Sequence, residues 1–126
     1  MGIQAMQTEV FAPASSLAVT ADLPVDSLHH PAAEDIELAA VLHALSDPMR
    51  LRIVTGLAVE DKRTCKSFDL PVTKSTCTHH FRVLREAGVI RQRLEGTTRL
   101  NSLRRADLDE RFPGLLDSVL GATASR

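Results

Sequence analysis

The hydrophobic positions of the chain follow helical spacing from about residue 34 and alternate like a strand after residue 88. Residues 34–45 (EDIELAAVLHAL) predict a helix with acids in its first turn, where the helix dipole favours them. Ile36, Ala39, Ala40 and His43 stand at helical spacing along it, with Leu42 flanking them. Residues 49–59 predict a second helix with Leu51, Val54, Leu57 and Ala58 facing inward beside Ile53.

Local signals predict where the second helix begins and how it packs. Asp47 is a suitable N-cap because its carboxylate can accept hydrogen bonds from the first free N–H groups. Pro48 suits the first helical position, where its missing N–H has no cost. Gly56, inside the helix, weakens it by about 1 kcal/mol relative to alanine and therefore indicates a close approach by another element.

A helix-turn-helix is predicted between residues 64 and 88. Thr64 is expected to cap a short helix over residues 65–70, which Pro71 ends because the residue before proline avoids helical geometry. Thr73 is expected to cap the next helix, and Gly88 to end it in the left-handed conformation. This helix has an apolar side made by Cys77, Phe81, Leu84 and Ala87, with His80 packed beside it. Its other side is polar or cationic, with no acid before Glu86: Lys74, Ser75, Thr78, His79, Arg82 and Arg85.

Residues 89–103 predict a β-hairpin. The first arm alternates from Ile90 to Leu94, the turn is made by residues 95–97 with Gly96 at positive φ, and residues 98–103 return. Two strands alone are marginally stable, so the hairpin must pack against the helices. We expect Arg91, Arg93 and Arg99 to make its solvent side cationic.

The two ends of the chain carry weaker signals. Residues 1–32, interrupted by Pro13, Pro24 and Pro31, predict a flexible tail in which His29 and His30 are exposed loop residues rather than metal ligands. Residues 104–120 predict a helix broken at Pro113, which can take the first position of the last segment. The folded domain is thus expected over residues 33–120, with a frayed end at residues 121–126. The last segment has an apolar face that can pair subunits, together with the helix at 34–45, or pack on the protomer's own core: Phe112, Leu115, Leu116, Val119 and Leu120.

Composition places these elements in one small domain with an aliphatic core. The chain has 126 residues, of which 44% are hydrophobic and 25% charged, and its aromatic residues are four phenylalanines. That balance is typical of a folded globular domain. The sequence has no apolar run of membrane-spanning length, so we expect no membrane partner and a cytoplasmic location.

The net charge of −1 conceals a strong asymmetry. Residues 1–60 contain eight acidic and two basic residues, whereas residues 62–105 contain eleven basic and three acidic ones. A basic block in a nearly neutral chain is either a solvated charged surface or a binding site for a polyanion. Its coincidence with the polar helix and the arginine-bearing hairpin favours DNA.

Candidate chemistry is limited to the two cysteines. The sequence has no phosphate-binding glycine loop, no paired-carboxylate motif and no metalloprotease motif, so we expect no catalytic residue and no enzyme. Cys77 lies on the inner side of its helix and is expected to behave as a small hydrophobe. Cys65 follows Lys62 and Arg63 and precedes Lys66, a basic setting that increases thiol reactivity. Three roles remain open for the pair: structural thiols, a redox switch through Cys65, or metal ligands.

Two segments resemble the ArsR/SmtB family of bacterial repressors. LHALSDPMRLRIVTGL is similar to the family's helix-turn-proline-helix segment, and KSTCTHHFRVLREAGVIRQRLEGTTRLNSL to its recognition helix and wing. The resemblance covers about residues 34–120. It implies a mainly α fold with a small β-hairpin wing, the winged helix-turn-helix. It also implies a homodimeric repressor that binds a palindromic operator on double-stranded DNA and releases it in response to a metal, a small effector or an oxidant.

The resemblance also implies which residues meet DNA and which family features are missing. The positions that fall on the family's DNA-reading helix and wing are Thr73, Lys74, Ser75, Thr78, His79, Arg82, Arg91, Arg93, Thr97, Thr98 and Arg99. The family's metal site in the helix-turn-helix uses two close cysteines, whereas only Cys65 stands here. Its other zinc site uses histidine with acids near the last helix, and no histidine follows His80. We therefore expect no metal and no cofactor, with Cys65 as the candidate sensor thiol. The remaining alternative is a protein-binding winged helix without DNA affinity.

Overall fold

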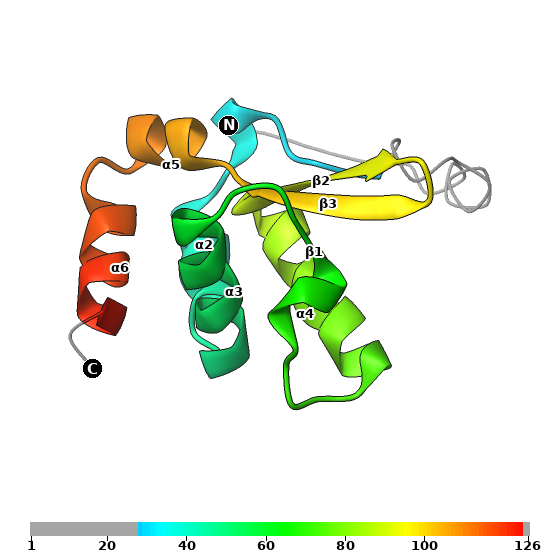
Figure 1. Cartoon of the computed structure of the whole chain (residues 1–126). Helices are drawn as coiled ribbons and strands as arrows, with labels where there is room; N and C mark the ends of the chain where they lie inside the picture. The colour runs from blue at the N-terminus through cyan, green and yellow to red at the C-terminus, as the bar shows by residue number, and fades with distance from the viewer. Residues whose placement is uncertain (1–27, 125–126) are drawn as a thin grey trace.

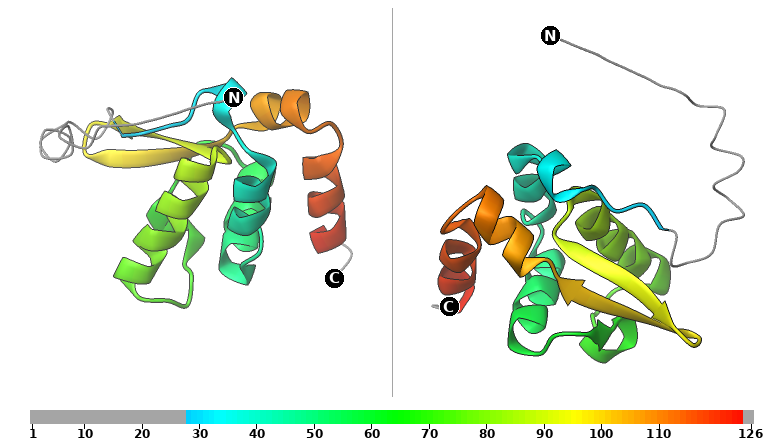
Figure 2. Two further views of the ribbon diagram at one scale, coloured as in Figure 1. Left: turned by 180° about the vertical axis from the view of Figure 1, so that it is seen from behind. Right: turned by 90° about the horizontal axis from the view of Figure 1, so that it is seen from above.

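The computed structural model describes residues 28–124, which form a helical body with a projecting β-hairpin (Figure 1). The hairpin extends sideways from the end of α4 that adjoins it, and the helices lie to one side of it (Figures 1 and 2). In chain order the elements are η4 (Ala33–Asp35), α2 (Leu38–Ala44), α3 (Pro48–Val59), β1 (Arg63–Thr64), η5 (Cys65–Phe68), α4 (Lys74–Ala87), β2 (Ile90–Glu95), β3 (Thr98–Leu103), α5 (Arg105–Arg111) and α6 (Leu115–Ala124).

The predicted cap of α3 is confirmed. The Asp47 carboxylate accepts from the N–H of Met49 at 2.8 Å and of Arg50 at 3.1 Å, and Pro48 is the first residue of the helix. Close packing at Gly56 is also confirmed, since a Cβ built there would lie 2.7 Å from Cε1 of Phe68. A side chain at position 56 would therefore push the helix-turn-helix away from α3.

The first helix is shorter than expected, and its buried positions differ in part from the spacing read from the sequence. Residues 33–35 form a separate turn, and α2 begins only at Leu38. Val41 and Ala44 are buried, whereas Ala39 and His43, which stand at the helical spacing read from the sequence, are exposed. The break between η4 and α2 shifts the helical phase, which a single continuous period cannot anticipate.

The first helix of the helix-turn-helix is a short 3-10 turn rather than the α-helix expected over residues 65–70. Thr64 makes no side-chain cap, because its backbone is taken up in β1, and Asp69 ends the turn with φ of 49°. Phe68 buries its ring against Phe81 of α4, with ring centroids 5.7 Å apart. This contact fixes the short turn to the longer helix that follows it.

The predicted hairpin forms, but its turn is shorter than expected because Glu95 belongs to β2, and it pairs with a strand that the sequence did not indicate. β2 and β3 are antiparallel, and Gly96 has φ of 63° in the turn. The order β1-β3-β2 adds a two-residue strand at the edge of β3. The register places Arg99 opposite Leu94, and Arg93 opposite Leu100. Since paired residues share a face of the sheet, Arg99 lies on the opposite face from Arg91 and Arg93, contrary to the single cationic side that we expected.

The C-terminal helices pack on the body of the same protomer. α5 and α6 are separated at Phe112, Pro113 and Gly114, so Pro113 divides them as predicted but is not the first residue of α6. Leu116 is 2% exposed in the protomer's own core rather than free to pair subunits. α6 continues through Ala124, beyond residue 120, where we expected the fold to end. No helix in the described range is long and apolar enough to cross a membrane.

Candidate nucleic-acid interface

One side of α4 presents the residues predicted to read DNA. Thr73 caps the helix by accepting from the N–H of Thr76 at 3.2 Å, and Gly88 ends it with φ of 90°. The predicted reading residues on this helix and its cap are all exposed: Thr73, Lys74, Ser75, Thr78, His79 and Arg82. Because the first acid of the helix is Glu86, the exposed surface up to Arg82 carries only neutral or basic groups.

The opposite side of α4 is buried and includes two polar residues. His80 is 7% exposed, which confirms that it packs inward, and its Nδ1 accepts from Nη1 of Arg50 at 3.2 Å. Arg50 also donates through Nε to the carbonyl of Ala44 at 2.7 Å. Arg85, which the pattern placed on the outer side, is only 7% exposed. The cationic outer face therefore ends one turn earlier than predicted.

The wing residues are displayed on two different faces. Thr97 and Thr98 are exposed at the turn, and Arg99 is half-buried. Arg91 and Arg93 are exposed, but Arg93 lies 2.7 Å from Glu95 and Arg91 lies 3.9 Å from Asp107. Ion pairs at the surface are weak, so these arginines remain free to exchange a carboxylate for a phosphate. Arg99 lies on the other face of the wing, beside the cleft that α4 also lines.

A cleft of about 920 Å³ is lined by α4, η5 and the wing. Three basic side chains, Lys66, Lys74 and Arg99, line it with one acid, Asp69. The cleft thus has a cationic lining open to solvent, an arrangement that attracts the backbone of a polyanion. Its full lining is Thr64, Cys65, Lys66, Asp69, Leu70, Val72, Lys74, Cys77, Thr78, Phe81, Thr97, Thr98 and Arg99.

Both cysteines line this same cleft as free thiols. Cys65 is half-buried, and its Sγ accepts a weak hydrogen bond from Nδ2 of Asn101 at 3.5 Å. Burial raises the pKa of the Cys77 thiol, and the neighbouring Cys65 raises it further. A raised pKa favours the protonated, unreactive thiol, so Cys77 behaves as the packed residue that its position predicts.

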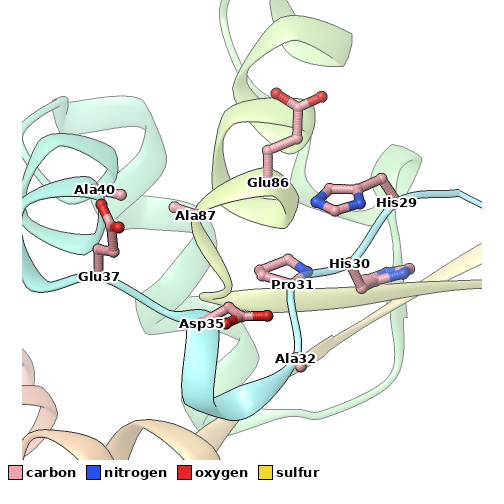
Figure 3. Close-up of a pocket in the computed structure, with 9 residues that line it drawn as sticks. All are labelled: His29, His30, Pro31, Ala32, Asp35, Glu37, Ala40, Glu86 and Ala87. Atoms are coloured by element: carbon pink, nitrogen blue, oxygen red, sulfur yellow. The ribbon is translucent and has the colours of Figure 1, made fainter. Parts of the chain in front are cut away.

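The N-terminal segment at 28–32 lies against α4 and the edge strand β2 (Figure 3). His29 is exposed as expected, but His30 is half-buried and not a free loop residue. Its Nδ1 donates to the carbonyl of Leu28 at 2.9 Å, and its Nε2 accepts from the N–H of Gln92 at 3.0 Å. Burial lowers the pKa of His30, which favours the neutral ring that this pair of hydrogen bonds requires. The remaining part of the predicted tail, residues 1–27, lies outside the described residues.

A second cavity, of about 410 Å³, opens beside this segment between η4, α2 and the end of α4 (Figure 3). His29, Asp35, Glu37 and Glu86 contribute polar groups to its lining. Among residues 28–124, however, no group of three or more histidine, cysteine, aspartate or glutamate side chains could hold a metal ion. The cavity lies beside the C-terminal end of α4.

Comparison with known proteins decides the family. The model of a helix-turn-helix domain family matches residues 45–93. A transcriptional regulator of the helix-turn-helix type from Bacillus subtilis, YceK, is 34% identical over 84 residues, which are 64% of this chain and 84% of that protein. The chain belongs to the helix-turn-helix transcriptional regulators.

Solved structures of similar fold are transcriptional regulators. The transcriptional repressor BigR from Xylella fastidiosa has a TM-score of 0.54 at 24% identity, covering 68% of this chain and 84% of that one. An ArsR family transcriptional regulator has a TM-score of 0.53 at 22% identity, covering 64% and 90%. The winged helix-turn-helix predicted from the sequence is confirmed. The protein is a DNA-binding transcriptional regulator, and its relatives are regulators rather than enzymes.

Proposed function

We propose that this regulator is a cytoplasmic repressor that binds a palindromic operator as a homodimer, with α4 in the major groove and the wing on the backbone. The exposed side of α4 supports the proposal because it carries Lys74, Thr78 and Arg82 with no acid among them. Arginine can read guanine through two hydrogen bonds, and lysine near a helix N-terminus suits a phosphate. The fold and the family are those of DNA-binding proteins, and a surface that carries only basic charges favours an anionic ligand such as DNA.

The remaining predicted contacts take supporting roles in this proposal. Ser75, Thr78 and His79 are exposed donors beside Arg82 and are proposed to meet base edges or adjacent phosphates. Thr73 already uses its hydroxyl in the helix cap, so its contribution would come through the helix end that it orders. On the wing, Thr97, Thr98 and Arg99 are proposed to hold the backbone next to the cleft. Arg91 and Arg93, on the other face, are proposed as outer phosphate contacts.

DNA binding of this kind must weaken steeply with salt, because each neutralised phosphate releases counterions. We expect the affinity for duplex DNA to fall by at least about 1000-fold between ~50 and ~200 mM salt if six or more phosphates are contacted. Fluorescence anisotropy with a duplex selected from a random pool measures this. Retention that ignores salt, or no retention of any duplex, would favour the alternative of a winged helix that binds only protein.

The homodimer is supported by apolar side chains that the protomer leaves exposed on α2. Leu38 is 46% and Leu42 is 48% exposed, and residues four apart lie on the same side of a helix. In α6, Leu115, Val119 and Leu120 are only partly buried against the core. A second protomer that covers these positions would remove apolar surface from water at about 25 cal/mol per Å².

We expect replacement of both Leu38 and Leu42 by glutamate to raise the dimer dissociation constant by at least about 100-fold, because each fully buried leucine contributes roughly 1.5–3 kcal/mol. Sedimentation equilibrium at micromolar concentration measures it. Val59→Glu is the matched control, since Val59 is also apolar but 84% exposed at the end of α3. A wild-type protein that sediments as a monomer would refute the dimer, and an unchanged double variant would place the interface elsewhere.

Cys65 is proposed as a sensor thiol, supported by its partial exposure to the cationic cleft beside Lys66. Peroxide converts a reactive thiolate to a sulfenic acid, which would enlarge the side chain between η5 and Asn101. We expect peroxide to lower the DNA affinity of the wild type several-fold and to have no effect on Cys65→Ser. Cys77→Ser is the matched control and should respond like the wild type. The same response in Cys65→Ser and in wild type, measured by gel shift, would eliminate this role.

A further inference from the structure

Three buried polar side chains form a continuous chain of hydrogen bonds beneath the wing. Arg85 of α4 donates through Nη1 to Oε1 of Gln92 in β2 at 2.8 Å. Gln92 donates through Nε2 to Oδ1 of Asn101 in β3, also at 2.8 Å. Asn101 in turn donates through Nδ2 to the carbonyl of Arg63 in β1 at 3.0 Å. These hydrogen bonds link α4 to β2, β2 to β3, and β3 to the backbone of β1.

Because its members are buried, this chain of hydrogen bonds is costly to break. Arg85 is 7%, Gln92 2% and Asn101 0% exposed, so none of the three can replace its partner by water without moving. A polar group left unpaired in such surroundings loses its full solvation. The two amide groups each use an oxygen as acceptor and a nitrogen as donor, which fixes their orientation along the chain. An apolar core of the same volume would hold the hairpin without specifying one angle between the hairpin and α4.

The N-terminal segment completes the arrangement from the outside. The carbonyl of His29 accepts from Nε of Arg85 at 3.2 Å, and the ring of His30 accepts the backbone N–H of Gln92. The carbonyl of Pro31 accepts from Nη1 of the buried Arg104 at 2.8 Å. Residues 29–31 therefore hold Arg85 and the edge of β2 in place from the solvent side.

This chain of hydrogen bonds lies on the same face of the wing as Arg99. Arg99 precedes Asn101 by two residues in β3, and Gln92 pairs with Asn101 across the hairpin. Residues two apart in a strand share a face, so Arg99 projects from the same face as the buried chain. A rotation of the hairpin about its root would move Arg99 toward or away from α4 without unfolding either strand.

We propose that Gln92 and Arg85 are positioning residues, which set the angle between the wing and α4 so that Arg99 meets the DNA backbone while α4 occupies the groove. This inference rests on the proposed DNA contact by Arg99. Neither Gln92 nor Arg85 touches DNA. Their effect on binding passes through the wing.

A double-mutant cycle on Gln92→Leu and Arg99→Ala tests the proposal. We expect each variant alone to weaken binding to a selected duplex by about tenfold. Each should also reduce the slope of log affinity against log salt by about one unit, the loss of one phosphate contact. If Gln92 acts through Arg99, the double variant will bind about as well as Arg99→Ala alone, because the loss is shared. Stoichiometric titration of the active fraction separates weaker binding from loss of folded protein.

Each outcome has a distinct meaning. Losses that multiply in the double variant, or an unchanged affinity in Gln92→Leu, would overturn the positioning role while leaving the wing contact standing. An unchanged affinity in Arg99→Ala would overturn the proposed wing contact itself, and the positioning role with it. If Gln92→Leu does not fold, Arg85→Lys provides the second arm, since an ammonium retains the charge but cannot reproduce the forked contact with both Gln92 and His29. The same non-additivity with Arg99→Ala is then expected.

Discussion

Replacement of Arg82 by alanine is expected to lower affinity for the operator by about 10- to 100-fold per half-site. A bidentate arginine contact to a base edge contributes about 1–3 kcal/mol of discrimination, and a dimer on a palindrome loses it twice. Arg82 is the last exposed cation on the outer side of α4, where its guanidinium can reach the floor of a groove. Binding to a nonspecific duplex should weaken much less, so the specificity ratio should fall.

The measurement is competition between a duplex selected from a random pool and a scrambled duplex of the same length. Arg52→Ala provides the control, since Arg52 is an exposed arginine on α3, outside the proposed reading surface. It removes the same charge and should leave the ratio unchanged. Equal weakening on both duplexes by Arg82→Ala would assign Arg82 to a phosphate rather than to a base.

Gly88→Ala is expected to have the largest effect on stability, lowering the free energy of unfolding by about 2–5 kcal/mol. A left-handed conformation costs an L-residue roughly 1–2 kcal/mol, and overpacking of a filled site adds about 1–3 kcal/mol. Both apply here, since Gly88 has φ of 90° and a Cβ there would lie 2.6 Å from Cγ1 of Ile36. Ile36 is fully buried, so it has little room to yield.

Gly96→Ala separates the two contributions. Gly96 also has positive φ, but a Cβ there would meet nothing within 4 Å. We therefore expect this variant to lose only the conformational part, about 1–2 kcal/mol. Urea unfolding followed by circular dichroism compares them. Equal losses in the two variants would show that Ile36 moves aside and that the close contact costs nothing.

The helix-turn-helix and the hairpin could be predicted because their signals are local. Asp47, Thr73 and Gly88 act on the backbone within a turn of their own position, and each performs the role that its residue type indicates. The turn at Gly96 is likewise set by its immediate neighbours. Such features depend on stereochemistry that a short stretch of sequence contains in full.

The parts that escaped prediction depend on contacts between distant segments. Nothing in the two residues of β1 distinguishes them from a loop, and they become a strand only because β3 lies beside them. The helical pattern places Arg85 with the surface cations, whereas in the fold it is buried and donates to Gln92, seven residues later. The face on which Arg99 lies depends on the strand register, and the register depends on the length of the turn. Polar residues at isolated positions carry no periodicity, so buried ones among them cannot be recognised from the sequence pattern.

The separation of the two sides of α4 also bears on how such a regulator can acquire a new target. Thr78 and Arg82 are exposed, whereas the fold is held by the buried side of the helix, where Phe81 and Leu84 pack. Exposed substitutions away from structural contacts usually change stability by no more than about 0.5 kcal/mol. Mutations at these two positions can therefore accumulate almost neutrally for folding while operator preference drifts. In a directed-evolution experiment, a library confined to Thr78 and Arg82 would be expected to yield mostly folded proteins with altered target sequences.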